Sequence, residues 1–214
     1  MSDSVPVVRI VDDDDSFLAA LSRLLRAAGY SVKTFSSGQE FLDHLADDPG
    51  CVIADLRMPG LNGLDLQEAL TRTGFSLPVI FLSGQGDIPT TVYAMRHGAE
   101  DFLTKAAPKE DVLEAVERAL ARDAQQREER ARLGQLRARF AVLTPREREV
   151  LRQVVRGLLN KQIAAELGIH ERTVKLHRTA ITSKLRVRSV AELTQLVQEA
   201  GELEDRSPTF PKGQ

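Results

Sequence analysis

Short apolar runs alternate with helix-length segments through the first half of the chain, and they predict the strands of a buried sheet. Four continuous runs, each bounded by polar or turn residues, lie at 7–11, 51–54, 77–82 and 101–104. Runs of this kind are typical of parallel strands that are covered on both faces. A fifth segment, 30–35, alternates apolar and polar residues, as a more exposed edge strand does. The repeated strand–helix order predicts a doubly wound α/β domain with a five-stranded parallel sheet.

Helical patterns replace the strand pattern in the second half, where four short helices are expected. The first, over 145–156, is predicted from an N-cap at Thr144 and an acid three residues later at Glu147. Asn160 is expected to cap the second helix, which ends at Gly168. The other two are predicted over 171–185 and 190–200. The sequence therefore predicts a small all-α domain after the sheet domain.

The segment between the two domains predicts one long helix. It begins after Pro108, carries apolar residues on one side at first, and is rich in Arg, Glu, Gln and Ala over 122–139. An uncoiled, charged linker is the alternative, because charged helices without a packed face are only marginally stable. The expected organisation is a sheet domain at 1–122, a helical linker at 123–139, an all-α domain at 140–202 and a disordered tail at 203–214.

The charge distribution separates the two halves more sharply than the net charge of −2 suggests. Residues 1–125 hold 11 Lys and Arg against 20 Asp and Glu, a net charge of −9, whereas residues 126–214 hold 18 against 11, a net charge of +7. A basic half suggests a polyanionic partner, and an acidic half with clustered aspartates suggests a cation or phosphoryl site.

The chain is expected to act in the reducing cytoplasm and not in a membrane. Cys51 is the only cysteine and lies in an apolar run, so no disulfide within the chain is possible and a core thiol is predicted. The N-terminus shows no basic segment followed by an apolar one, and no stretch approaches about 18 consecutive apolar residues. Neither a signal peptide nor a membrane span is expected.

Isolated polar residues follow the apolar runs at the edge of the sheet where doubly wound folds bind ligands. They are Asp12, Asp13, Asp55, Ser83 and Lys105. Three carboxylates placed so close together repel one another unless a hard cation neutralises them, and Mg²⁺ prefers such oxygen ligands. A carboxylate on the central strand can attack a phosphoryl group, while a lysine and a hydroxyl stabilise the phosphoryl oxygens.

These positions, with the segment 55–63 (DLRMPGLNG), resemble the receiver domain of two-component response regulators over residues 5–122. The resemblance implies a flavodoxin-like fold in which Asp55 accepts a phosphoryl group from a sensor histidine kinase. It also implies that Asp13 and the Arg57 main-chain carbonyl bind Mg²⁺, with Asp12 assisting through water. Ser83 and Phe102 then form a switch pair that remodels the surface of the fourth helix and fifth strand.

Two features depart from the receiver pattern. The family usually follows its lysine with a proline after a cis peptide bond, whereas Ala106 follows Lys105 here. Asp14 and Asp15 extend the aspartate pair to four, and one of the two is expected to cap the first helix. Arg57 and Gln85 flank the route of an attacking water, so we hypothesise that they set the lifetime of the acyl phosphate.

The helices over 160–167 and 171–185 form a helix-turn-helix pattern. Ile163, Ala164 and Leu167 are expected to face Val174 and Leu176 across the glycine turn. The second helix carries cationic residues on its other side, at Arg172, Lys175, Arg178 and Lys184. A basic helix can enter the major groove of DNA, where phosphates supply affinity and base edges supply specificity.

The segments 143–151 (LTPREREVL), 160–164 (NKQIA) and 173–177 (TVKLH) resemble the LuxR-type DNA-binding domain over residues 140–202. The resemblance implies that Lys175, Leu176 and Thr179 point at base edges. It places a second set near phosphates, namely Thr173, His177, Arg178 and Lys184. His177 has an alternative role, in which it packs against its own domain as a neutral histidine.

Together the halves resemble a response regulator of the FixJ/NarL group. The resemblance implies a protein that is phosphorylated, dimerises, binds promoter DNA and regulates transcription by RNA polymerase, with activation the commoner behaviour. Two alternatives stay open. One is a DNA-binding regulator that is independent of phosphorylation and uses its receiver as a dimerisation scaffold; the other is an aspartyl-phosphate hydrolase. The sequence also leaves open whether the linker helix stays rigid or melts on activation.

Overall fold

The computed structural model describes residues 5–84 and 88–201, and the chain divides into two compact units, 1–128 and 129–214. The predicted tail at 203–214 and Gln85 lie outside the described residues. The two units are referred to as the N-terminal and the C-terminal unit. No helix within the described ranges is both long and apolar enough to cross a bilayer.

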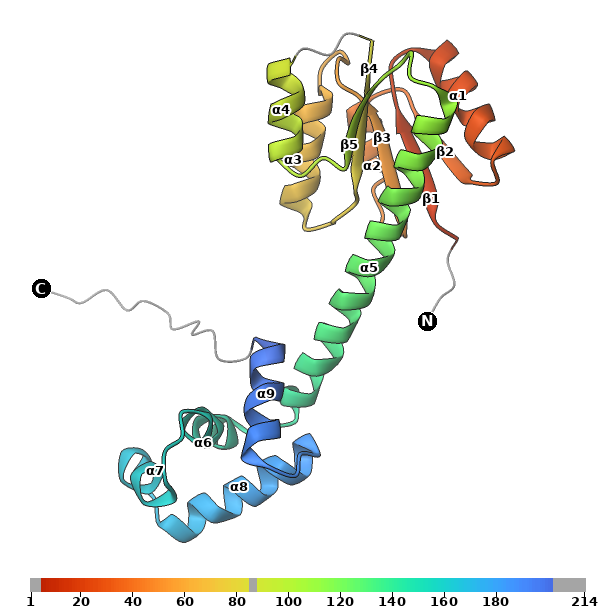
Figure 1. The fold of residues 1–214 in the computed structure, drawn as a ribbon. Helices are drawn as coiled ribbons and strands as arrows, with labels where there is room; N and C mark the ends of the chain where they lie inside the picture. Colours follow the sequence, from red (N-terminus) through yellow and green to blue (C-terminus); the bar gives the residue numbers. More distant parts are fainter. Residues whose placement is uncertain (1–4, 85–87, 202–214) are drawn as a thin grey trace, which may run out of the picture. The chain divides into compact units, whose positions relative to one another are not determined.

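The N-terminal unit contains a five-stranded parallel sheet with the order β2-β1-β3-β4-β5 (Figure 1). This confirms the doubly wound fold predicted from the apolar runs. The strands are β1 (Val7–Val11), β2 (Ser31–Phe35), β3 (Gly50–Asp55), β4 (Val79–Ser83) and β5 (Asp101–Thr104). The helices that connect them are α1 (Asp15–Ala27), α2 (Gly38–Asp43), α3 (Gly63–Thr73) and α4 (Ile88–Arg96), and α5 (Lys109–Ala141) follows β5.

Two apolar layers cover the sheet. One lies between the sheet and helices α1 and α5, and the other lies between the sheet and helices α2, α3 and α4. Alternate residues of each central strand therefore enter opposite layers, so all six residues of β3 are buried. Cys51 lies in the first layer as predicted, and burial raises the pKa of its thiol to about 12.

The helix α5 is continuous from Lys109 to Ala141, as the long-helix prediction requires. Its contacts with the sheet continue past residue 122. Asp123, which is 1% exposed, accepts a hydrogen bond of 2.8 Å from the Gly50 N–H at the start of β3. Arg127 bonds both Asp123 oxygens, at 2.9 and 3.0 Å, and the Asp48 carbonyl, at 2.9 Å. These bonds attach α5 to the N-terminal unit as far as residue 127.

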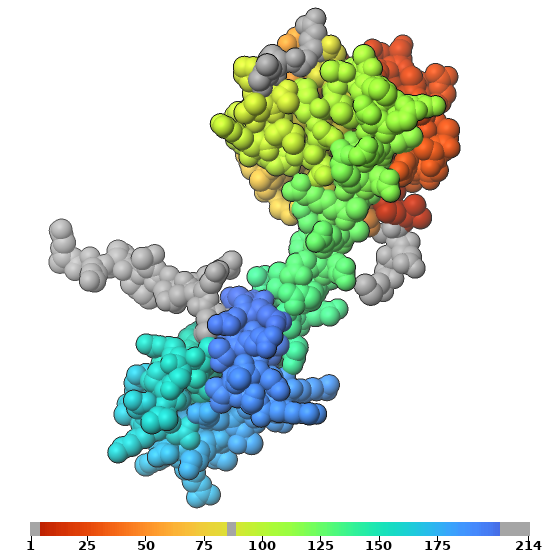
Figure 2. Space-filling model, in the orientation of Figure 1, coloured from red at the N-terminus to blue at the C-terminus, as the bar shows by residue number. Residues whose placement is uncertain are grey.

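The C-terminal unit consists of the end of α5 and four short helices, as predicted. They are α6 (Pro145–Val155), α7 (Asn160–Leu167), α8 (Glu171–Leu185) and α9 (Val190–Ala200). Within this unit α9 lies beside the last turns of α5 (Figures 1 and 2), where the Arg137 side chain donates to the Ala200 carbonyl at 3.4 Å. Buried residues of all five helices form one apolar core.

The helix ends in this unit confirm one predicted cap and correct another. Thr144 and Glu147 form the predicted capping box at the start of α6. The predicted cap at Asn160 is wrong, because Leu159 occupies the N-cap position and Asn160 is the first helical residue. The Asn160 amide oxygen instead accepts a hydrogen bond of 2.9 Å from Arg178. The Asn160 side chain therefore joins α7 to α8.

Candidate functional site

An acidic cluster lies at the carboxyl ends of β1 and β3, where the sequence predicted it. Asp12 and Asp13 follow β1, and Asp55 is the last residue of β3. One carboxylate oxygen from each lies within 4.8 Å of the others, and Asp12 and Asp55 are buried while Asp13 is exposed. Three carboxylates with one side open to solvent match the oxygen-rich, partly hydrated coordination that Mg²⁺ prefers.

Lys105 links two members of this cluster. Its Nζ lies 2.6 Å from Asp12 Oδ2 and 2.9 Å from Asp55 Oδ2. Burial raises the pKa of Asp12, although the bond from Lys105 opposes that effect. Burial also disfavours the charge on Lys105, but the bonds to Asp12 and Asp55 outweigh it and raise the lysine pKa. Lys105 is therefore cationic at neutral pH and is available to neutralise anionic oxygens beside Asp55.

The peptide bond between Lys105 and Ala106 is trans, as are all peptide bonds of the described residues. With this trans bond, and with Ala106 in place of the usual proline, Lys105 still reaches both Asp12 and Asp55. The turn that follows is closed by a bond of 2.9 Å from the Ala107 N–H to the Thr104 carbonyl. A second bond of 2.9 Å, from the Lys105 N–H to the Ser83 carbonyl, attaches the backbone of Lys105 to the end of β4.

The remaining predicted residues of the N-terminal unit differ in how deeply they are buried. Ser83 ends β4 and is 1% exposed, and the Arg57 N–H donates to Asp55 Oδ1 at 3.3 Å while the Arg57 side chain is exposed. Phe102 is half-buried in β5, with its ring centroid 6.2 Å from that of Phe81. The switch role of Phe102 stays a prediction.

The first turn of α1 connects to the cluster through backbone bonds. Asp12 Oδ1 accepts a bond of 2.9 Å from the Asp14 N–H, and Asp14 Oδ1 accepts bonds from the Ser16 and Phe17 N–H groups. Asp14 is therefore the expected cap of the first helix. The sequence did not indicate that the Phe17 ring lies against Lys105, with the Lys105 Nζ 4.6 Å from the ring centroid.

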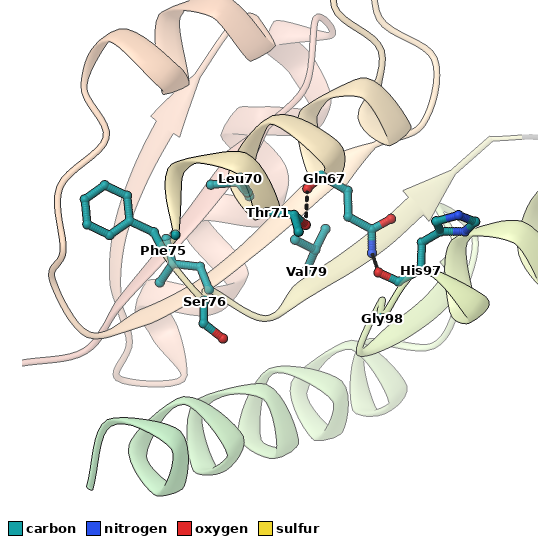
Figure 3. Close-up of a pocket in the computed structure, with 10 residues that line it drawn as sticks. Gln67, Leu70, Thr71, Phe75, Ser76, Val79, His97 and Gly98 are labelled. Atoms are coloured by element: carbon teal, nitrogen blue, oxygen red, sulfur yellow. Dashed lines mark hydrogen bonds between the residues drawn. The ribbon is translucent and has the colours of Figure 1, made fainter. Parts of the chain in front are cut away.

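A pocket of about 220 Å³ lies at the opposite edge of the sheet, around the segments that lead into β4 and β5 (Figure 3). Its lining includes Gln67, Phe75, Ser76 and His97, and the Gln67 amide donates to the His97 carbonyl at 3.2 Å. None of the predicted site residues that the structure describes lines it. The candidate chemistry of this unit is therefore concentrated at the acidic cluster.

Helix α8 presents part of the predicted DNA-binding set to solvent. Arg172, Lys175, Leu176 and Thr179 are exposed, whereas Thr173, His177 and Arg178 are half-buried. Val174 packs in the core with Ile163 as expected. The expected packing of Leu176 is wrong, because its side chain is 64% exposed. An exposed apolar side chain beside cationic ones fits contact with base edges better than a role in the core.

Two of the cations predicted to lie near phosphates have partners inside the C-terminal unit. Arg178 bonds Asn160, and Lys184 Nζ bonds both oxygens of Glu147 at 2.7 and 2.9 Å. Glu147 is buried and also accepts from the Thr144 N–H at 2.7 Å. Lys184 therefore stabilises the start of α6, and its contact with phosphate stays a prediction.

The Glu147–Lys184 pair predicts a pH dependence of stability. The bond from Lys184, followed by that from the Thr144 N–H, lowers the pKa of Glu147 below its usual 4.5. A carboxylate whose pKa is lowered by folding stabilises the fold above its unfolded pKa, and this contribution is lost as the pH falls through the folded value. We expect the C-terminal unit to lose stability below pH 4.5, and Glu147→Gln to be less stable at pH 7 but less sensitive to acid.

Urea unfolding followed by circular dichroism between pH 3 and pH 7 measures this difference. Glu166→Gln is the matched control, since it removes an exposed carboxylate from α7. Equal pH profiles for the native chain and Glu147→Gln would show that the pair contributes nothing that depends on ionisation.

Comparison with known proteins assigns the family. Residues 8–117 match the response regulator receiver domain, and residues 141–197 match the luxR family of bacterial regulatory proteins. The chain is 45% identical over 199 residues to the response regulator protein TmoT of Ectopseudomonas mendocina, which covers 92% of this chain and 90% of TmoT. The chain belongs to the two-component response regulators. Both matched families are regulatory, so the hydrolase alternative gains no support.

Two further proteins match this response regulator over nearly its whole length. The transcriptional regulatory protein FixJ of Azorhizobium caulinodans is 40% identical over 213 residues, which cover 98% of this chain and all of that protein. The solved structure of the response regulator StyR superposes with a TM-score of 0.77 at 46% identity, covering 92% of this chain and all of StyR. The regulator is thus a receiver joined to a LuxR-type DNA-binding domain, a group whose members regulate transcription.

Proposed function

We propose that Asp55 accepts a phosphoryl group from a sensor histidine kinase and that the phosphorylated regulator dimerises on promoter DNA. The observation that carries this proposal is the placement of Lys105, whose Nζ lies 2.9 Å from Asp55 and 2.6 Å from Asp12. A nucleophilic carboxylate beside a fixed cation and two further carboxylates is the arrangement that phosphoryl transfer to aspartate needs.

In the proposed transfer an Asp55 carboxylate oxygen attacks phosphorus, and the bond to the histidine nitrogen of the kinase breaks. Asp12, Asp13, Asp55 and the Arg57 main-chain carbonyl would hold Mg²⁺, which when bound supplies positive charge to the phosphoryl oxygens. Lys105 shares that charge from the other side. The Ser83 hydroxyl donates to the acyl phosphate.

The switch proposed here couples Ser83 and Phe102 to the surface of α4 and β5. Exposed apolar side chains on α4 support dimerisation there, since Val92, Tyr93 and Met95 are 43%, 41% and 44% exposed. A dimer raises the effective concentration of the second DNA-binding domain, which tightens binding to paired half-sites. The proposed result is activation of transcription by RNA polymerase in the cytoplasm. Arg57 and Gln85 stay candidates for setting the phosphate lifetime.

Light scattering with Mg²⁺ and beryllium fluoride, a mimic of the phosphoryl group, tests the dimerisation step. We expect the apparent mass of the full chain to double when Mg²⁺ and beryllium fluoride are added together. With Mg²⁺ alone we expect the mass of a monomer. A dimer that forms without the mimic would favour the phosphorylation-independent scaffold. A monomer under both conditions would contradict the proposed coupling.

The proposed base contact of Lys175 predicts a loss of DNA affinity in a single variant. Lys175→Ala is expected to weaken specific binding by about 1–3 kcal/mol, the range measured for one good contact to a base edge. Arg152→Ala is the matched control, because it also removes an exposed cation, from α6. Fluorescence anisotropy with a labelled duplex at constant salt measures both. Equal losses of DNA affinity in the two variants would show that Lys175 contributes only general charge attraction.

A further inference from the structure

A closed chain of contacts joins the first turn of α1 to the acidic cluster. Asp12 Oδ1 accepts from the Asp14 N–H, Asp14 Oδ1 accepts from the Phe17 N–H at 3.1 Å, and the Phe17 ring lies under Lys105. Lys105 then returns to Asp12 through its Nζ. The cap that begins α1 thereby sets the position of an aromatic ring beside the lysine of the site.

The Phe17 ring is a further contact of the Lys105 side chain, in addition to its two carboxylate partners. A cavity of about 180 Å³ adjoins it, and its lining includes Phe17, Leu21, Leu82, Lys105, Ala107 and Lys109. Ala107 is among them, and its short side chain fills little of this space. A lysine has four rotatable side-chain bonds, so a contact beyond the ion pairs at Nζ further narrows the positions that the ammonium group takes.

The ring differs from the carboxylates in one respect that matters for phosphoryl transfer. In the proposed transfer, the Asp55 carboxylate loses its charge as it bonds to phosphorus, so its attraction for Lys105 changes. The attraction of a cation to the face of an aromatic ring involves neither a proton nor a carboxylate charge. It therefore does not depend on the charge state of Asp55.

We propose that Phe17 is a positioning residue for phosphoryl transfer, whose ring face holds the Lys105 ammonium in line with Asp55. The proposal rests on the function proposed for Asp55. The contact that joins Phe17 to the site is the one with Lys105, so Phe17 would act through Lys105. Its half-buried ring also packs against the layer between α1 and α5, and an experiment must separate that packing from the contact with Lys105.

Initial rates of phosphorylation by acetyl phosphate, followed by intact mass, separate the packing of the ring from its contact with Lys105. Phe17→Leu keeps an apolar side chain but removes the aromatic face, and Phe17→Tyr keeps the face. We expect Phe17→Leu to be slower by about fivefold, the size of a partly exposed cation–π contact, and Phe17→Tyr to stay within about twofold of the native chain. Unfolding midpoints of the three chains show whether the fold is equally intact.

A double-mutant cycle with Lys105→Met measures the coupling between Phe17 and Lys105, which a purely packing role of Phe17 would leave near zero. In the Lys105→Met background, Phe17→Leu is expected to change the rate by less than about 1.5-fold, since the partner of the ring is gone. The same fivefold loss in that background, or a native rate for Phe17→Leu alone, would overturn the proposal. A native chain that gains no phosphate on Asp55 would instead overturn the function on which it rests.

Discussion

Asp55→Asn is expected to take up no phosphate, while the native regulator gains the mass of one phosphate when incubated with Mg²⁺ and acetyl phosphate. The substitution keeps the size of the side chain but replaces a nucleophilic oxyanion with a neutral amide. It also removes one of the three carboxylates of the acidic cluster and the partner 2.9 Å from Lys105. Both the attacking atom and part of the cation site are lost.

Asp65→Asn is the matched control for this experiment. Asp65 is an exposed aspartate in the first turn of α3, outside the cluster. We expect it to be phosphorylated as the native chain is. An Asp55→Asn chain that still gains one phosphate would place the acceptor on another residue, and peptide mapping of the adduct would identify it.

Gly50→Ala is expected to prevent the receiver from folding stably. Gly50 begins β3 with a φ of +146°, and an added Cβ would lie 1.9 Å from the Val7 carbonyl oxygen of the neighbouring strand. Neither atom can move away without breaking the β1–β3 ladder or the bond from Gly50 to Asp123. We expect a loss of about 4 kcal/mol or more, which lies at the upper end for single substitutions.

Gly29→Ala separates this clash from the effect of backbone conformation alone. Gly29 also has a positive φ, of +94°, but no atom lies within 4 Å of an added Cβ. Its expected cost is about 1–2 kcal/mol, the penalty for a left-handed backbone. Chemical denaturation of the two variants measures the difference. Equal stability would show that β1 and β3 separate enough to admit a methyl group at Gly50.

The sequence was sufficient to predict the sheet and the cluster because both follow from local pattern and one topological rule. Buried parallel strands are continuous apolar runs, and their carboxyl ends meet at one edge of the sheet. The prediction that Asp12, Asp55 and Lys105 lie close together therefore needed only the order of the strands and the positions of their ends. The ends of short helices were less certain. Asn160 is a good N-cap residue by type, yet the helix begins one residue earlier than predicted.

The burial of Arg9 and Asp123 was not predicted, since the partners of these two charges are distant in the sequence. Arg9 was counted within an apolar run, yet it is 3% exposed and donates to the Asp48 carbonyl at 3.4 Å. Asp123 reaches Gly50 across 73 residues. An arginine inside a buried strand is itself a signal, because a buried charge needs partners. The sequence cannot say which residues supply them. The contact of Phe17 with Lys105 also joins residues that are distant in the sequence, and it was not predicted either.

The affinity of the full chain for duplex DNA, measured before and after phosphorylation, tests the central claim most directly. The duplex is selected from a randomised pool with the phosphorylated regulator, and salt is held constant. We expect acetyl phosphate and Mg²⁺ to tighten binding by at least about tenfold in the native chain and to leave Asp55→Asn unchanged. Equal affinity of the native chain in both states would contradict phosphorylation-controlled DNA binding.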